Sequence, residues 1–222
     1  MLDHEFVQFC VLLARARGVQ YSHCMTTRRH FILGLATLPF QAAFAKSKEP
    51  FPVSASDPQL VEYRFRRREV PYQTKLPKGT LFADIRKRYL YLILGDGKAI
   101  RYGVGIGRAA LAWEGEAVIK RKAKWPSWHP TPEMLNIYKS DGPWRDGMAG
   151  GPKNPLGARA LYLYENGVDT LFRIHGTHEP QTVGTASSRG CLRMVNVDII
   201  DLYDRVPVGT RVIVSRSGKA PS

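Results

Sequence analysis

The chain has 222 residues, which is enough for one compact domain and too few for two of ordinary size once a processed segment is removed. Its 33 Lys and Arg outnumber its 19 Asp and Glu, so the formal net charge is +14. A field of this sign favours polyanionic partners, such as nucleic acid, anionic lipid or the acidic polymers of a cell envelope.

The N-terminal region has the layout of an export signal. The basic pair Arg28-Arg29 precedes an apolar run over 31–40, which is too short to span a bilayer. Small residues ending at Ala45 suit a signal peptidase, so we predict a signal over 25–45, and the arginine pair resembles a twin-arginine signal. An N-terminal anchor that is never cleaved is the alternative. In both cases we expect the domain outside the cytoplasm, in the periplasm or cell envelope.

Residues 1–24 lack a clean basic start and are interpreted as an upstream extension of the reading frame. Removing residues 1–45 leaves one cysteine, Cys191, and no second apolar stretch long enough for a transmembrane segment. A single cysteine cannot form an internal disulfide, so this thiol is either inert and buried or a nucleophile. Export argues against nucleic acid as a partner, and no nucleic-acid-binding fingerprint is present.

Residues 46–79 are rich in proline and charge, and we interpret them as a linker leading into a domain over 80–216. Within the domain, short segments rich in apolar and β-branched residues are typical of strands. The segments 95–98 and 165–167 contain the glycine-rich signals of hairpin turns. We predict strands over 80–85, 89–94, 99–104, 117–123, 158–164, 170–174 and 210–214.

A long insertion over 124–157 holds three of the four tryptophans and several prolines and glycines. A loop of this length in a small domain is functional or disordered, and its aromatic residues favour an ordered substrate wall over a decorative surface loop. After Cys191, Asn196 can cap a short helix over 197–205. The predicted fold is therefore mainly β, a sandwich or barrel with one short helix after the cysteine.

A histidine and a cysteine frame the most informative segment. His175 ends a predicted strand, and Cys191 follows sixteen residues later. Cysteine needs a nearby base or cation to become a thiolate, and histidine titrates in the required range. Gly190 permits a tight turn in which the backbone amides of Gly190 and Cys191 converge on an oxyanion. The carbonyl of Gly176 is the economical candidate to hold the imidazole tautomer.

These residues match a known pattern. His175-Gly176 is followed about fifteen residues later by the segment 188–193, which reads Ser-Arg-Gly-Cys-Leu-Arg. The pattern resembles the L,D-transpeptidase (YkuD) catalytic domain family, and further family-like segments include 154–158. The resemblance covers roughly residues 80–214.

The resemblance implies a peptidoglycan enzyme. Cys191 would attack the carbonyl of the third residue of a tetrapeptide stem and release the terminal D-alanine, with His175 as base and then acid. The acyl group would pass to an amine of a second stem, giving a 3-3 cross-link, or to a lipoprotein. Transfer to water, which makes the enzyme an L,D-carboxypeptidase or cross-link hydrolase, is the first alternative. A peptidoglycan-binding module with an inert cysteine is the second.

The resemblance also implies substrate contacts. Arg193 suits the carboxylates of a stem peptide, with a structural ion pair as the alternative, and Ser188 shapes the turn. Trp128 and His129 lie in the long insertion, where the family builds part of the donor site. Arg189 departs from the usual family residue and, as a cation beside the thiol, would lower the pKa of the thiol. We expect no metal, no organic cofactor and a monomer.

Overall fold

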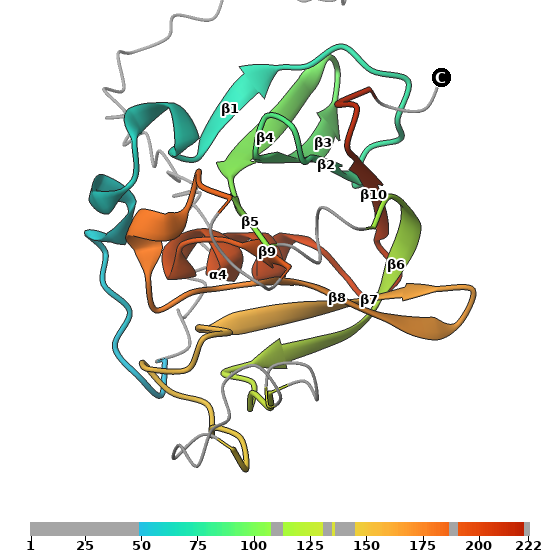
Figure 1. The fold of residues 1–222 in the computed structure, drawn as a ribbon. Helices are drawn as coiled ribbons and strands as arrows, with labels where there is room; N and C mark the ends of the chain where they lie inside the picture. The colour runs from blue at the N-terminus through green and yellow to red at the C-terminus, as the bar shows by residue number, and fades with distance from the viewer. Residues whose placement is uncertain (1–48, 108–112, 131–134, 136–144, 187–190, 220–222) are drawn as a thin grey trace, which may run out of the picture. The chain divides into compact units, whose positions relative to one another are not determined.

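A computed structural model describes residues 49–107, 113–130, 135, 145–186 and 191–219, and Figure 1 shows their arrangement. The predicted export signal over 25–45 and the extension before it lie outside the described residues. Ser188, Arg189 and Gly190 lie outside them as well.

The described residues form one ten-stranded sheet with the strand order β1-β4-β3-β2-β10-β6-β7-β8-β9-β5. The strands are β1 (Arg68–Pro71), β2 (Leu81–Asp84), β3 (Tyr89–Gly95), β4 (Lys98–Gly103), β5 (Gly105–Ile106), β6 (Gly115–Lys124), β7 (Arg159–Glu165), β8 (Val168–His175), β9 (Leu192–Arg193) and β10 (Arg211–Ser215). One α-helix, α4 (Asn196–Arg205), and the 3-10 helices η1 (Asp57–Leu60), η2 (Tyr63–Phe65) and η3 (Pro180–Thr182) complete the described elements.

The sheet curls back on itself. Strand β4 lies next to one end of the strand order and β5 forms the other end, yet Val104 alone separates the two strands in sequence. Figure 1 shows β5 leaving the end of β4 and running to β9. The fold is therefore mainly β and barrel-like, with one described α-helix after Cys191, which confirms the predicted fold class.

The hairpins form where the turn residues predicted them. Between β7 and β8, Asn166 and Gly167 both adopt positive φ, at 50° and 84°. Two consecutive residues of this kind match the right-handed twist of the flanking strands, and Asn-Gly adopts them at little cost. The β7–β8 turn thereby sets the register of the first pairs, Glu165 with Val168 and Tyr164 with Asp169.

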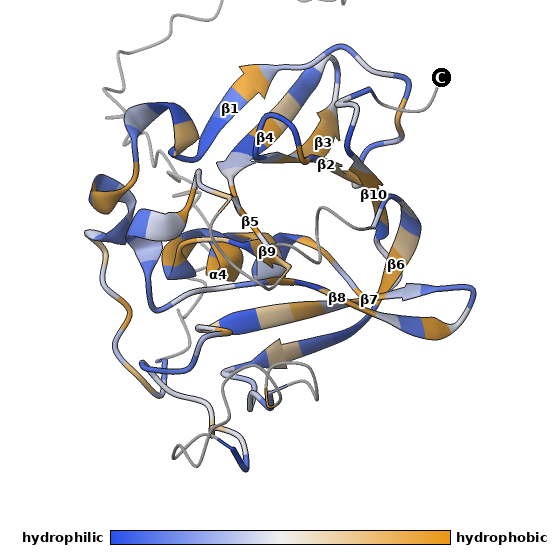
Figure 2. Cartoon of the chain, in the orientation of Figure 1, coloured by the Kyte–Doolittle hydropathy of each residue, from blue (hydrophilic) through white to orange (hydrophobic). Residues whose placement is uncertain are grey.

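Helix α4 packs against β7 and closes the core. Its residues Ile199 and Leu202 are fully buried within a cluster drawn from most strands of the sheet. Figure 2 shows the hydrophobic colours concentrated along β2 and β10, with mixed colours along β7 and β8. Among the described residues, no helix has the length and apolar character needed to cross a bilayer.

The predicted cap of this helix is wrong. Val195 occupies the N-cap position without a side-chain hydrogen bond, and Asn196 begins the helix. The Asn196 side chain instead accepts a hydrogen bond from the Ala158 amide at 2.9 Å and donates one to the Thr177 carbonyl at 2.8 Å. Because an amide side chain both donates and accepts, it satisfies two backbone groups that no strand partner reaches.

Part of the predicted linker is also corrected. Strand β1 pairs antiparallel with β4, and the side chains of Val61 and Phe65 are buried. The sequence did not predict this strand because its exposed arginines outnumber the few apolar residues that face the core. Strands β5 and β9 were missed because two residues each are too short to show a period.

Candidate active site

A short parallel ladder pairs the end of β8, which carries His175, with β9, which follows Cys191 directly. Strand β8 pairs with β9 so that Ile174 lies beside Leu192 and His175 lies beside Arg193. The Met194 amide donates to the His175 carbonyl at 2.9 Å and extends the ladder. Cys191 directly precedes β9, and the side chains of both Cys191 and His175 are buried.

The imidazole of His175 is buried, neutral and fixed in one tautomer. Its Nδ1 lies 2.6 Å from the Gly176 carbonyl oxygen. A carbonyl only accepts, so Nδ1 carries the proton and Nε2 keeps a lone pair. Burial lowers the pKa of His175 to about 4, the bond to Gly176 opposes this shift, and the charges of Arg193 and Arg173 add to it. Such a ring is a neutral base at physiological pH.

Gly176 occupies a position that only glycine fits. A Cβ at Gly176 would lie 2.3 Å from Oδ1 of Asn196, which is held by the Ala158 amide. The Gly176 amide donates to the Arg159 carbonyl at 3.0 Å. These contacts fix the peptide whose carbonyl orients His175.

The thiol of Cys191 is buried and protonated. Its side chain is 7% exposed, and its Sγ donates to the Leu171 carbonyl at 3.5 Å. Burial raises the pKa of the thiol to about 11, although the backbone N–H and the charge of Arg173 lower it, and the Asp169 carboxylate raises it. The resting site therefore pairs a neutral thiol with a neutral imidazole.

The burial of both groups opposes ionisation of the thiol by the histidine. Among the described residues, no hydrogen bond joins Cys191 to His175. Burial disfavours the charged form of both groups, and this effect outweighs the nearby cations.

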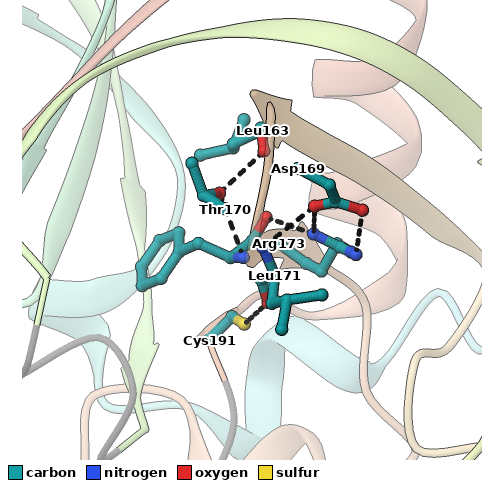
Figure 3. A network of polar contacts seen from close by, with 7 residues as sticks. Leu163, Asp169, Thr170, Leu171, Arg173 and Cys191 are labelled. Atoms are coloured by element: carbon teal, nitrogen blue, oxygen red, sulfur yellow. Dashed lines mark hydrogen bonds and ion pairs between the residues drawn. The ribbon is translucent and has the colours of Figure 1, made fainter. Parts of the chain in front are cut away.

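A bulge in β8 supplies the carbonyl that holds the thiol. Tyr162 pairs with Arg173 and Tyr164 pairs with Asp169, so residues 170–172 face Leu163 alone. We call residues 169–173 the β8 bulge. Figure 3 shows the side chains of Thr170 and Asp169 bonded to backbone groups at the bulge, namely the Leu163 carbonyl and the Leu171 and Phe172 amides.

The other predicted site residues are spread more widely. Arg193 is buried and shares the His175 face. Trp128 is partly buried and forms an isolated bridge with Met148, whereas His129 is exposed. In the described part of the chain, neither residue has a hydrogen bond to the histidine or the cysteine.

The described residues contain no group of three or more His, Cys, Asp or Glu side chains that could hold a metal ion. The residues that sequence reasoning missed are Asp169, Leu171 and Arg173. The sequence did contain a signal for the bulge, which is a break in the alternation of polar and apolar residues along 168–175. Asp169 followed by Thr170 favours a turn held by side-chain hydrogen bonds over a regular strand.

Comparisons with known proteins agree on a family. The model of the YkuD L,D-transpeptidase catalytic domain matches residues 78–214. Probable L,D-transpeptidase YbiS of Escherichia coli is 34% identical over 152 residues, which cover 64% of this chain and 47% of that protein. Probable L,D-transpeptidase ErfK/SrfK of Salmonella typhimurium is 35% identical over 158 residues, covering 68% of this chain and 50% of that protein.

A crystal structure described as a probable carnitine operon oxidoreductase from Brucella melitensis is 45% identical, with a TM-score of 0.49, and covers 69% of this chain and 96% of that one. The chain spans about half the length of the curated relatives it matches. With the family pattern matched over more than half of its residues, the chain belongs to the YkuD L,D-transpeptidase catalytic domain family.

Proposed function

We propose that the chain is a peptidoglycan L,D-transpeptidase that uses Cys191 as nucleophile and His175 as general base. The observation that carries the proposal is a buried thiol directly before β9, the strand that pairs with the end of β8, where a buried imidazole has its Nδ1 proton committed to Gly176. This arrangement leaves Nε2 as the only proton acceptor of the ring. The relatives named L,D-transpeptidases support the choice of acyl transfer as the reaction.

In the first step, Sγ attacks the carbonyl carbon of the third stem residue while Nε2 of His175 takes the thiol proton. The backbone amides of Gly190 and Cys191 would stabilise the oxyanion that forms. When the intermediate collapses, the bond to the terminal D-alanine breaks and His175 gives its proton to the leaving amine. A thioester on Cys191 remains.

In the second step, an acceptor amine attacks the thioester carbonyl. His175 takes a proton from that amine and returns it to the departing sulfur, which restores the resting thiol. An amine of a second stem gives a 3-3 cross-link, a lipoprotein amine gives tethering, and water gives carboxypeptidase activity. An imidazole with a low pKa takes the proton of the attacking thiol or amine only while the new bond to the carbonyl carbon forms. We therefore assign His175 general-base catalysis rather than a resting ion pair with Cys191.

Arg193 is the side chain we assign to a carboxylate of the stem peptide. Arg193 is buried and pairs with His175 across the β8–β9 ladder, and guanidinium–carboxylate pairs are strong and directional. Ser188, Trp128 and His129 are assigned to the outer part of the donor site. Export to the periplasm or envelope, where this substrate lies, is part of the same proposal.

Mass spectrometry of the intact protein tests the proposal. We expect incubation with a tetrapeptide-stem muropeptide to add the donor mass minus D-alanine, with the adduct on the peptide that carries Cys191. Cys191→Ala should form no adduct and release no D-alanine. Release of D-alanine by Cys191→Ala, or an adduct on another residue, would overturn the assignment, and a product formed with water would identify the carboxypeptidase.

A further inference from the structure

The resting thiol donates its hydrogen bond to a backbone carbonyl. Sγ of Cys191 donates to the Leu171 oxygen at 3.5 Å, a normal length for a hydrogen bond from sulfur. A carbonyl accepts a proton and repels a thiolate, so this contact exists for the protonated sulfur alone. Leu171 is therefore the acceptor that defines the resting state of the nucleophile.

The conformation of Leu171 is unusual and is held by its neighbours. Its φ is +57°, in the left-handed region that costs a residue with a side chain about 1–2 kcal/mol. The Leu171 amide donates to Oδ1 of Asp169 at 2.9 Å. Thr170 Oγ1 accepts from the Phe172 amide at 3.1 Å and donates to the Leu163 carbonyl at 2.7 Å. The carbonyl of Leu171 is left for the thiol.

An ion pair fixes the ends of the β8 bulge. Arg173 donates to both carboxylate oxygens of Asp169, at 2.6 and 2.8 Å, and also to the Phe172 carbonyl at 3.0 Å. Figure 3 shows Asp169 and Arg173 on one side of the Leu171 peptide and Cys191 on the other. The side chains of Asp169 and Arg173 thus fix the peptide that carries the Leu171 carbonyl, whereas the hydrogen bond from Arg173 to the sulfur comes from its backbone N–H.

We propose that Asp169 and Arg173 are positioning residues that hold the Leu171 carbonyl in place as the hydrogen-bond acceptor of the resting Cys191 thiol. Substrate binding would then release the thiol to Nε2 of His175. The proposal rests on the proposed role of Cys191 as nucleophile. Its consequence is protection, because oxidants and alkylating agents attack the thiolate and spare the thiol.

Direct electrostatics makes a different prediction for the same residues. The charge of Arg173 by itself lowers the thiol pKa and that of Asp169 raises it. If charge alone mattered, Arg173→Gln would slow alkylation of Cys191 and Asp169→Asn would speed it. If both residues act by holding Leu171, both substitutions free the thiol and both speed alkylation.

Alkylation by iodoacetamide distinguishes the positioning role from direct electrostatics. The full chain is alkylated without substrate over a pH series, and the modification is quantified on the peptide that carries Cys191. We expect Asp169→Asn and Arg173→Gln each to raise the rate at pH 8 about tenfold, equivalent to lowering the thiol pKa by one unit. Arg173→Lys keeps the charge and loses the two-pronged contact, so it should also raise the rate.

Two controls exclude unfolding as the cause. Glu116→Gln breaks an ion pair with Arg211 between β6 and β10, and Glu49→Gln breaks a buried pair with Arg159. Both should leave the alkylation rate within about twofold of wild type. Opposite effects of Asp169→Asn and Arg173→Gln, no effect of either, or acceleration by the controls would overturn the inference. The assay needs no turnover, so its outcome is independent of the adduct test of the proposed function.

Discussion

Two arginines of the β7–β8 hairpin each form an ion pair with a carboxylate, and the two pairs have different roles. Arg159, 1% exposed, pairs with Glu49 from 110 residues away and ties the segment before η1 to β7. Arg173 pairs with Asp169 four residues away, with side chains 15% and 32% exposed, and shapes the carbonyl that holds Cys191. Register places the two arginines on opposite faces of the hairpin. Burial and sequence separation, more than the identity of the pair, decide whether it stabilises the fold or adjusts the site.

The largest expected effect on stability belongs to the buried pair. Glu49→Gln leaves the Arg159 guanidinium buried without its carboxylate and should lower the free energy of unfolding by about 3 kcal/mol, measured by urea denaturation. Glu49 also accepts from Nε1 of Trp125 at 2.8 Å, so tryptophan fluorescence should report the loss. Adding Arg159→Met should recover most of the stability. A loss below roughly 0.5 kcal/mol, the scale of an exposed ion pair, would contradict the comparison.

The smallest expected effect concerns the strained residue of the β8 bulge. The Leu171 side chain is 74% exposed, so Leu171→Gly removes little packing. It relieves about 1–2 kcal/mol of left-handed strain and adds about 0.5–1 kcal/mol of backbone entropy loss on folding. We expect a net gain of roughly 0.5 kcal/mol in the free energy of unfolding, with alkylation of Cys191 unchanged. Faster alkylation would show that the side chain of Leu171, and not its carbonyl, guards the thiol.

Much of the fold was readable in the sequence. Local signals located the hairpin turns at 95–98 and 165–167 and the strands around them, because turn chemistry and alternation act over a few residues. The sequence did not predict that the sheet curls back at Val104. The two-residue strands β5 and β9 form only by pairing with segments that are distant in sequence. The role of Asn196 was misread for the same reason, as its partners Ala158 and Thr177 are remote in sequence.

The candidate site divides in the same way. The family pattern pointed to His175 and Cys191, and the structure places His175 at the end of β8 and Cys191 directly before β9, which pairs with it. Protonation could not be read from residue types, because burial sets the pKa of both groups and burial depends on the whole fold. The β8 bulge was equally hidden, since it arises from a register shift between two strands.

The central claim is that a neutral His175 deprotonates Cys191 during attack, and the pH dependence of adduct formation with a tetrapeptide stem tests it most directly. The base must be unprotonated, so with its pKa lowered to about 4 the rate of acylation should persist through pH 5 and fall only as the pH drops through about 4. His175→Ala should reduce the rate at pH 7 by about 100-fold or more. Loss of the wild-type rate already near pH 6.5, or an unchanged rate in His175→Ala, would contradict the account.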